Sequence, residues 1–464
     1  MLPRQGNCST CPSHSQVVYL VANAHQTAKP SVTVLGAGVT GVASAWYLLE
    51  AGFDVTVIDR QSQPAMETSF ANGGQISVCH ATPWANPNTP IKALKWLSKP
   101  NAPLLYRLNT NAEQLRFIWR FLQECRASRA DANLQQMVKL GLYSRRTLKE
   151  LMANLPLDFE QRLQGIMHFY TSVSEYQSAI APTKRMQTLG CHRTLISPNE
   201  AVALEPSLSA LGSTLVGATY TDADLSANAH IFTNKLASYC QSRGVTFLYD
   251  THIDNIALDD KHVSHITIRQ GITQQTHQSD HYVICLASYG KRLLDPIGVH
   301  LPIFPAKGYS ATYAVRDGTR VPQISLIDDE YKLVMSRFTT YERDVLRVAG
   351  TAEFNGYNTD LDPTRCQALT QRVQALFGDA LNYDEPNYWA GLRPMTPSNV
   401  PLIGRAYLGN VWHGRTSDNL IDNLWINTGH GTLGFTHACG SARALSHLMT
   451  GQTPPVDFAF VGHK

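Results

Sequence analysis

The chain has 464 residues, of which 43% are hydrophobic and 16% are charged, and its formal net charge at neutral pH is only +3. This length is too great for one small domain and suits two, each with a full hydrophobic core. The nearly balanced charge argues against the broad positive field that a nucleic-acid-binding protein needs.

Residues 1–30 lack the apolar core and the small-residue cleavage site of a secretory signal, so we expect a flexible leader. Cys8 and Cys11 form an isolated C-x-x-C within it. Because a structural zinc needs four ligands, we explain this spacing by chance and predict no metal site. The nine cysteines are odd in number and scattered, as in a protein of the reducing cytosol. No segment approaches the roughly 20 apolar residues of a membrane span, so any membrane contact would be peripheral.

Residues 31–60 predict a strand, a glycine turn, a helix and a second strand. Gly36, Gly38 and Gly41 form G-x-G-x-x-G, which permits a tight turn, lets the backbone approach a pyrophosphate, and packs helix closely on strand. The helix N-terminus then binds phosphate. Asp59 ends the second strand, where a carboxylate accepts hydrogen bonds from the hydroxyls of a ribose. The order of strand, helix and acid favours a dinucleotide site over an ordinary glycine-rich turn.

The segment 68–77, TSFANGGQIS, alternates small residues with Asn72 and Gln75. Such a segment lets a flat ligand lie against the backbone and bond to its amides. A plain surface turn would explain the glycines equally well, but it would not explain the apolar Phe70 and Ile76 beside them.

Residues 90–107 mix lysines with Trp96 and several leucines. Cations beside apolar side chains are typical of an element that lies at a membrane interface. An amphipathic helix packed on its own domain is the simpler interpretation, and we favour it.

The middle of the chain alternates helical and strand patterns. Residues 111–153 and 229–243 predict helices, and 281–290 predicts a buried strand that ends in a small-residue turn. Ser197 or Asn199 caps a short helix that stops before Pro206. Alternation over 308–355 is typical of an antiparallel sheet with one covered face.

The C-terminal part begins with 391–404, which we interpret as a loop that projects one arginine among prolines. Residues 423–451 predict a strand, a glycine turn and a long helix. The helix start, Gly429 to Thr432, offers free amides and a positive dipole end to an anion.

Several segments together resemble the flavin-dependent D-amino-acid oxidase superfamily, which includes glycine and sarcosine oxidases. The similarity extends from about residue 31 to 457 and is strongest to the branch of bacterial D-amino-acid dehydrogenase small subunits. The segments that carry it are GAGVTG, TSFANGGQIS, HATPWANPNTPIKALKW, KGYS, VAGTAEFNGY, GLRPMTPSNVPLIG and NTGHGTLGFTHACGSA.

The resemblance implies FAD as cofactor. It places the three glycines on the pyrophosphate, Asp59 on the ribose, Ile253 near the adenine, and 431–433 at the pyrimidine end of the flavin ring. Reduced flavin carries negative charge at that end, and a helix N-terminus is preorganised to stabilise it. The residues assigned to the cofactor in this way are Gly36, Gly38, Val39, Gly41, Asp59, Arg60, Ser69, Asn72, Gly74, Gln75, Ile253, Ala287, Ser288, Gly431, Thr432 and Leu433.

The resemblance also assigns Arg393 to the substrate carboxylate. A guanidinium suits this task because its planar fork donates two parallel, charge-assisted hydrogen bonds; a surface arginine is the alternative. Tyr309 and Tyr313 either line the substrate pocket or belong to the core. His430 either faces the flavin or caps its helix. The segment 222–228 departs from the family, which leaves its contacts and the substrate preference open.

The predicted fold is α/β, a Rossmann-like FAD-binding domain interleaved with a substrate domain built on a mostly antiparallel sheet. We expect the FAD-binding domain to comprise 31–98, 216–299 and 391–457. The substrate domain is expected to comprise 99–215 and 300–390.

The implied reaction is oxidation of a D-amino acid by hydride transfer from Cα to flavin N5, after which water releases a 2-oxo acid and ammonia. No side chain is assigned as a general base. Electrons would pass to a quinone or another carrier, for a cytoplasmic protein in peripheral contact with the inner membrane. The alternatives are an oxygen-using oxidase of glycine, sarcosine or D-proline, and a flavin-binding subunit without catalysis. A tRNA-modifying oxidase is weaker, because no basic stripe carries aromatic platforms.

Overall fold

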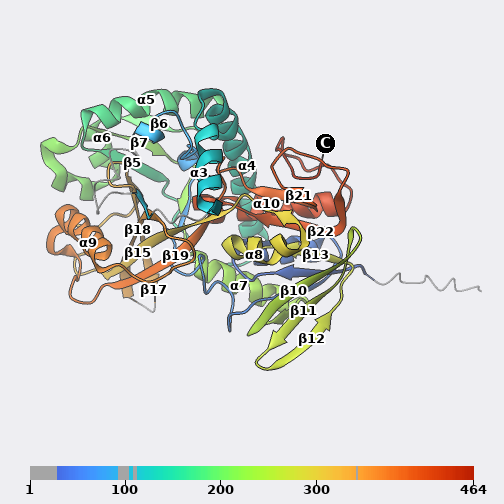
Figure 1. Ribbon diagram of the computed structural model, residues 1–464. Helices are drawn as coiled ribbons and strands as arrows, with labels where there is room; N and C mark the ends of the chain where they lie inside the picture. Colours follow the sequence, from blue (N-terminus) through green and yellow to red (C-terminus); the bar gives the residue numbers. More distant parts are fainter. Residues whose placement is uncertain (1–28, 92–103, 108–111, 341–342, 464) are drawn as a thin grey trace, which may run out of the picture.

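The computed structural model describes residues 29–91, 104–107, 112–340 and 343–463 (Figure 1). Two large sheets dominate it, one on each side of the view in Figure 1, and a small three-stranded sheet lies below the six-stranded one. The predicted leader, 1–30, lies outside the described residues except for its last two. Most of the predicted interfacial segment, 92–103, also lies outside them.

The first sheet has six strands in the order β20-β22-β13-β1-β2-β9, and only β20 is antiparallel to its neighbour. Val32 and Val34 of β1 pack against the helices α1, α7 and α10, whereas Leu35 packs against the three-stranded sheet β10-β11-β12. The central strands β1 and β13 are mostly buried, because both faces of this parallel sheet are covered. The elements of this layer are β1 (Ser31–Leu35), α1 (Val39–Glu50), β2 (Asp54–Ile58), α7 (Ala229–Ser242), β9 (Thr246–Leu248), β10 (Thr251–Asp259), β11 (His262–Gln270), β12 (Thr273–His277), β13 (His281–Ile284), β20 (Leu402–Tyr407), β22 (Leu420–Thr428) and α10 (Gly434–Met449).

The second sheet has nine strands in the order β19-β15-β18-β17-β16-β5-β7-β6, and β4 pairs with β18. All its pairs are antiparallel except β16 with β5 and β18 with β4. The predicted mostly antiparallel sheet is therefore confirmed, and α9 covers its apolar core through Leu369 and Val373. The elements are β4 (Leu104–Tyr106), β5 (Ile166–Tyr170), β6 (Thr194–Ile196), β7 (Gly217–Thr221), β15 (Phe304–Ala314), β16 (Ser325–Asp328), β17 (Leu333–Thr340), β18 (Arg343–Phe354), α9 (Pro363–Phe377) and β19 (Asn387–Met395).

The remaining helices and short strands connect the two sheets. Ser197 caps one of them as predicted, in a capping box with Glu200. These elements are β3 (Gln75–Ile76), the 3-10 turn η1 (Val78–His80), α3 (Ala112–Glu124), α4 (Ala127–Asn154), α5 (Val173–Thr188), α6 (Pro198–Leu204), β8 (Leu225–Ser226), α8 (Gly290–Leu294), β14 (Val299–His300), β21 (Gly409–Asn410) and the 3-10 turn η6 (Gly431–Leu433).

The predicted loop at 391–404 is wrong at both ends, because Arg393 lies on strand β19 and residues 402–404 begin strand β20. Arg393 pairs with Ala306 and Pro394 pairs with Pro305. Prolines argue against a strand only when a neighbour needs their missing N–H, and β19 is the edge strand of its sheet. Arg393 is consequently held by a sheet rather than by a loop.

The domain boundaries expected at 216 and 391 fall just before strand β7 and within strand β19, and both strands belong to the nine-stranded sheet. The division into domains stays a prediction. In the described part of the chain, no helix is both long enough and apolar enough to cross a bilayer.

Candidate active site

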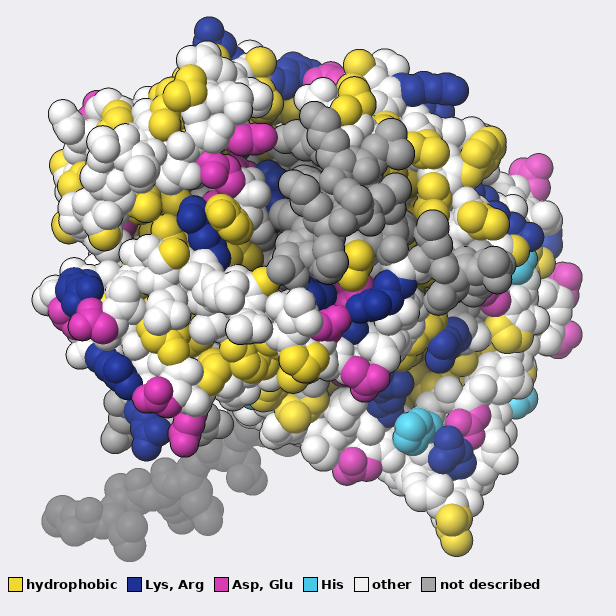
Figure 2. Space-filling view, turned by 60° about the vertical axis from the view of Figure 1, so that its left-hand side comes forward, with side chains coloured by type: hydrophobic (Ala, Val, Ile, Leu, Met, Phe, Trp, Pro, Cys, Tyr) yellow, Lys and Arg dark blue, Asp and Glu magenta, His cyan; other side chains and the backbone are white. Residues whose placement is uncertain are grey.

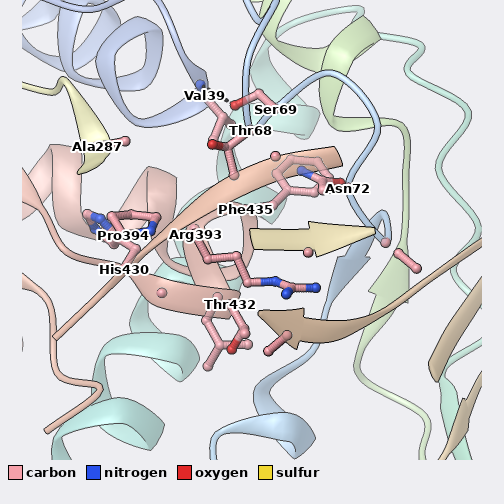
Figure 3. A pocket seen from close by; sticks show the side chains of 18 of the residues that line it. Val39, Thr68, Ser69, Asn72, Ala287, Arg393, Pro394, His430, Thr432 and Phe435 are labelled. Carbon is pink, nitrogen blue, oxygen red and sulfur yellow. Dashed lines mark hydrogen bonds between the residues drawn. The ribbon is translucent and has the colours of Figure 1, made fainter. Parts of the chain in front are cut away.

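A cavity of about 960 Å³ runs between the two sheets (Figure 3). Ligand pockets occupy roughly 300–1,000 Å³, so this cavity is large enough for a dinucleotide together with a small substrate. The β1–α1 turn, the segment 65–75 and η6 contribute to its wall from the first sheet and its connections. Strands β18 and β19 and helix α5 contribute from the other side.

The β1–α1 turn is shaped by close backbone approach. A Cβ on Gly41 would lie 1.8 Å from the carbonyl oxygen of Gly36, so only glycine lets the helix pack there. A Cβ on Gly38 would meet only the Ser69 hydroxyl, at 3.6 Å, and Gly38 lines the cavity. The Val39 amide donates to Ser69 Oγ at 3.0 Å, as Figure 3 shows. Because the first turn of α1 carries no acidic side chain, its positive end suits a pyrophosphate.

Asp59 holds the same turn together. Its Oδ2 accepts from the Ala37 amide at 2.6 Å and its Oδ1 from the Gln61 amide at 2.8 Å. Burial raises the pKa of this carboxyl, and the two amides oppose that rise. A carboxylate has about four acceptor sites. Asp59 lines the cavity, so its remaining sites fit the predicted ribose hydroxyls.

The segment 68–77 differs from its prediction in one respect. Gly74 has φ +63°, and a Cβ there would lie 2.7 Å from the carbonyl oxygen of Ala227. The glycine therefore allows two protein segments to approach, a role that the sequence did not predict, and it also lines the cavity. Asn72 Oδ1 accepts from the Gly74 amide at 2.9 Å, and Gln75 donates to Ser325 Oγ at 2.8 Å. These bonds hold a segment whose residues line the cavity.

The C-terminal glycine turn forms another part of the wall. Gly431, Thr432 and Leu433 make up η6 and line the cavity, and α10 begins only at Gly434. His430 makes no capping bond through its side chain; its Nε2 lies 3.1 Å from Ser441 Oγ. Burial and then the neighbouring His437 lower the pKa of His430 to about 3, so it is neutral at pH 7.

A buried oxygen at the same place lacks a partner. Asn427 Nδ2 donates to Ser44 Oγ at 3.0 Å, but Asn427 Oδ1 has no hydrogen-bond partner in the described part of the chain. Asn427 lines the cavity. A buried oxygen without a partner can accept a hydrogen bond from an N–H group of a ligand ring. This supports the assignment of FAD.

The other predicted cofactor residues divide into two groups. Arg60, Ile253 and Ala287 line the cavity, and the Arg60 guanidinium stacks 3.9 Å above the Tyr289 ring. Gly41 and Ser288 do not line it. Gly41 packs behind the turn, and Ser288 is buried with its hydroxyl 3.4 Å from the Leu392 carbonyl.

Arg393 is the polar centre of the opposite part of the cavity. Its Nη1 donates to the Thr351 carbonyl at 2.7 Å and its Nη2 to the Gly350 carbonyl at 3.4 Å. No carboxylate pairs with it among the described residues. Burial lowers the pKa of Arg393 to about 10, so the guanidinium stays charged at neutral pH. Figure 3 shows the side chain reaching across the pocket, with the guanidinium pointing away from His430.

A desolvated cation without a counter-charge is costly, and an anionic ligand would relieve that cost. The space for Arg393 is kept by Gly308 on the neighbouring strand, where a Cβ would lie 2.2 Å from Nη1. The cavity thus combines a glycine turn whose amide end suits a phosphate with a half-buried cation that has no acidic partner among the described residues.

The two predicted tyrosines behave differently. Tyr309 lines the cavity, but its hydroxyl donates to Glu353 at 2.7 Å, and Glu353 also pairs with Lys307 at 3.3 Å. Tyr313 does not line the cavity. It is fully buried and its hydroxyl bonds to Thr370, which corrects its assignment to the pocket in favour of the core alternative.

Sequence reasoning missed a group of polar residues near Arg393. They come from separate segments, and only His80 falls in a stretch that was singled out, HATPW. No spacing in the sequence predicts their proximity. They are Cys79, His80, His168, Arg193, Asp329 and Lys332, all of which line the cavity.

The unusual segment 222–228 supports this group from behind. Asp224 accepts from the Cys79 amide at 2.9 Å and pairs with Arg145 of α4 at 2.6 Å. Asn228 caps α7. In the described ranges, no three histidine, cysteine or acidic side chains are grouped as a metal site requires.

Comparison with known proteins gives a consistent result. Residues 31–448 match the family model described as FAD dependent oxidoreductase. The chain is 45% identical over 433 residues to a D-amino acid dehydrogenase of Dechloromonas aromatica, covering 93% of this chain and 99% of that protein. It is 41% identical over 433 residues to a D-amino acid dehydrogenase of Paramagnetospirillum magneticum, with 93% and 97% covered.

Among solved structures, a glycine oxidase from Bacillus cereus superposes with a TM-score of 0.66 at 19% identity, covering 91% of this chain and 95% of that one. An L-proline dehydrogenase from P. horikoshii gives 0.68 at 16% identity, with 92% and 95% covered. At such identities the likeness shows the fold alone.

Proposed function

Since the chain belongs to the FAD dependent oxidoreductase family, we propose that it is a D-amino acid dehydrogenase whose substrate binds through its carboxylate to Arg393. The observation that carries the proposal is the buried guanidinium of Arg393, which has no acidic partner among the described residues and lies in the same cavity as the phosphate-binding turn. The names of the relatives support the substrate class.

Arg393 would orient the substrate. Its two terminal nitrogens already donate to the carbonyls of Thr351 and Gly350, which fix the plane of the guanidinium. A fixed fork binds a carboxylate in one orientation, and so directs the amine and Cα to a defined part of the cavity. Bound FAD supplies the acceptor for the hydride that leaves Cα.

The cofactor would be held by residues that the chain already positions. The amide end of α1 and Gly38 suit the pyrophosphate, Asp59 suits the ribose, and η6 with Asn427 suits the ring system. These groups come mostly from backbone, so they need no rearrangement to bind the cofactor.

For the electron acceptor we propose a membrane quinone that approaches at α3. Leu115, Trp119 and Leu122 are 56%, 62% and 49% exposed, and their spacing puts them on one side of the helix, the outer face of α3. Phe117 is buried on the other side, and Phe121 lines the cavity. One side of α3 therefore lies toward the cavity and the other carries the exposed apolar side chains, so the helix separates the two.

The charge around the outer face of α3 suits anionic lipid. Arg116 and Arg415 are exposed. The pKa of Arg120 is lowered first by burial and then by the charges of these two arginines. Cations beside exposed aromatic and aliphatic side chains are what an interfacial helix needs.

A nucleic-acid substrate is disfavoured. On the described part of the face in Figure 2, basic and acidic side chains are interspersed rather than gathered in a stripe. An oxygen-using amine oxidase and a flavin-binding subunit without catalysis stay as alternatives that chemistry must separate.

The decisive experiment is anaerobic mixing of the yellow holoprotein with D-alanine, L-alanine or sarcosine while the flavin absorbance near ~450 nm is followed. Bleaching by D-alanine alone is the expected result. Bleaching by sarcosine or L-alanine would move the chain to a neighbouring amine oxidase, and no bleaching by any amine would contradict catalysis on amines. Reoxidation by a soluble quinone faster than by oxygen is expected for a dehydrogenase.

A further inference from the structure

Two stacked histidines line the cavity near Arg393, and neither belongs to the groups proposed to bind the substrate carboxylate or the cofactor. The rings of His80 on η1 and His168 on β5 lie 5.7 Å apart at an angle of 21°. His168 Nδ1 donates to the Asp329 carboxylate at 2.7 Å, and its Nε2 lies 3.4 Å from the Cys79 thiol. Because a carboxylate only accepts, the hydrogen of His168 is on Nδ1 and the ring is fixed.

His80 differs from His168 because its ring nitrogens have no hydrogen-bond partner among the described residues. His80 Nδ1 is covered by protein and makes no hydrogen bond within this part of the chain. The residue as a whole is half-buried and lines the cavity. His80 Nε2 is neither covered nor hydrogen-bonded to any described residue, so it is the ring nitrogen open to the cavity.

The charges that face His80 come from several elements. The negative charge of Asp329, just before β17, favours the protonated form of His80. The positive charges of Lys332, Arg193 and Arg393 disfavour that form. Burial has the largest effect, and together these influences lower the pKa of His80 to about 4. Behind η1, the charges of Asp224 and of Arg145 on α4 pair with each other. At neutral pH His80 is therefore uncharged, with a lone pair available in the cavity.

We propose that His80 Nε2 accepts the proton that the substrate ammonium group must lose before oxidation, while the substrate carboxylate is bound to Arg393. The substrate N–H bond breaks, its electron pair stays on nitrogen, and a new Nε2–H bond forms on His80. The neutral amine can then donate its lone pair as the hydride departs from Cα. This inference rests on the proposed function, since it requires an amino acid in the site.

Substrate binding would itself favour this transfer. A carboxylate on Arg393 cancels one of the three cations that disfavour a proton on His80. Asp329 then stabilises the imidazolium. It stays ionised because, against the effect of burial, His168, Lys332 and Arg193 hold the pKa of its carboxyl well below the usual range. His80 is a weak base in the empty cavity and becomes a stronger one when the substrate arrives.

The test is the pH dependence of flavin reduction by D-alanine in three holoproteins: wild type, His80→Gln and His192→Gln. His192 is an exposed histidine, and His192→Gln makes the same chemical change outside the cavity. With an internal proton acceptor, the reduction rate has a plateau around neutral pH. Without one, the rate follows the fraction of free amine, and so rises about tenfold per pH unit. At pH 7 we expect His80→Gln to be slower by about 10²- to 10⁴-fold and to approach wild type at alkaline pH.

A second measurement separates proton transfer from structure. Propionate, a carboxylate without an amine, should perturb the flavin spectrum of His80→Gln and of wild type with dissociation constants that agree within about threefold. If His80→Gln loses its flavin, His80→Ala with added imidazole replaces it, and imidazole should restore both the rate and the plateau.

The outcomes are distinct. A His80→Gln profile parallel to wild type, or a flavin-loaded His80→Ala that imidazole does not rescue, would overturn the role of His80 and leave the proposed function intact. A wild-type protein that no D-amino acid reduces would overturn the proposed function first and the role of His80 with it.

Discussion

The two ends of the cavity, a nucleotide end and a proposed substrate end, present different kinds of chemical groups. At the nucleotide end, the groups that suit a ligand are backbone amides and one carboxylate, and they come from a single stretch, residues 36–59. At the substrate end they are charged side chains from strands and loops far apart in the sequence, led by Arg393, Arg193 and Asp329. The first end is shaped by sterics and the second by electrostatics.

This difference determines how each end tolerates change. Each carboxylate oxygen of Asp59 already accepts a hydrogen bond from a backbone amide of the protein. Arg393 has no acidic partner in the part of the chain that the structure describes. We therefore expect substitutions at the nucleotide end to abolish binding of the cofactor, and substitutions at the substrate end to alter kinetics while the cofactor stays bound.

The largest effect is expected for Gly41→Ala. Its Cβ would lie 1.8 Å from the Gly36 carbonyl oxygen, so the turn must move and the holoprotein should lose its flavin entirely. Overpacking of this kind costs about 1–3 kcal/mol of stability. Gly38→Ala is the matched control, since its Cβ meets only Ser69 Oγ at 3.6 Å. It should weaken FAD binding without lowering the melting temperature of the apoprotein. Equal flavin content and melting temperature in Gly41→Ala and wild type would contradict the steric account.

Arg393→Ala should leave the flavin bound and lower kcat/KM for D-amino acids on the order of 10²- to 10³-fold. The reason is that removal of one partner of a buried charge pair costs about 2–5 kcal/mol of binding free energy. Arg393→Lys keeps the charge but not the fork, and should lie in between. Arg343→Ala, at an exposed position of the same sheet, serves as the control and should match wild type. Steady-state kinetics with flavin content measured in parallel distinguishes the three, and an Arg393→Ala enzyme with normal kinetics would exclude the carboxylate role.

Acid should affect the buried histidines and Asp59 in opposite directions. Burial lowers the pKa of His80 to about 4 and of His168 and His430 to about 3, so the unfolded chain binds protons that the folded chain does not. Each such histidine reduces the unfolding free energy by up to about 1.4 kcal/mol per pH unit as pH falls below 6.5. Asp59 has a raised pKa, so its contribution instead decreases as pH rises through its own titration range.

The net expectation is a falling melting temperature between pH 6.5 and 4.5, with the histidines dominating. Thermal melts of wild type and His168→Gln across this range test it: the variant should have the shallower slope, whatever its stability at pH 7. A wild-type melting temperature that stays constant from pH 7 to 5 would show that these histidines are not buried in the neutral form.

The smallest effect concerns the outer face of α3, which neither end of the cavity includes. Trp119→Glu should reduce sedimentation with anionic vesicles by about tenfold or more, since an inserted aromatic contributes about 1.5–3 kcal/mol. Leu163→Glu is the matched control, because Leu163 is equally exposed, at 62%, but lies outside α3. Flavin reduction by D-alanine should be normal in both. Equal vesicle binding by the two variants would argue against this surface.

The nucleotide end could be predicted from the sequence because its physics is local. The three glycines, the helix and Asp59 lie within one βαβ unit, and their roles depend on backbone geometry over neighbouring residues. The same holds for the capping box at Ser197. The resemblance to known flavoenzymes extended this prediction to Arg393. The residue pattern itself gave the wrong local structure there, because prolines on an edge strand resemble those of a loop.

The substrate end was decided by the tertiary structure. His80, His168, Arg193 and Asp329 are separated by tens of residues. The last three meet because strands β5, β6 and β16 lie in one sheet, and His80 joins them from the turn η1. No periodicity or spacing marks them, since each is an ordinary polar residue within its own segment. Their burial, their shifted pKa values and the open nitrogen of His80 arise from packing between distant segments, and a sequence pattern does not contain that information.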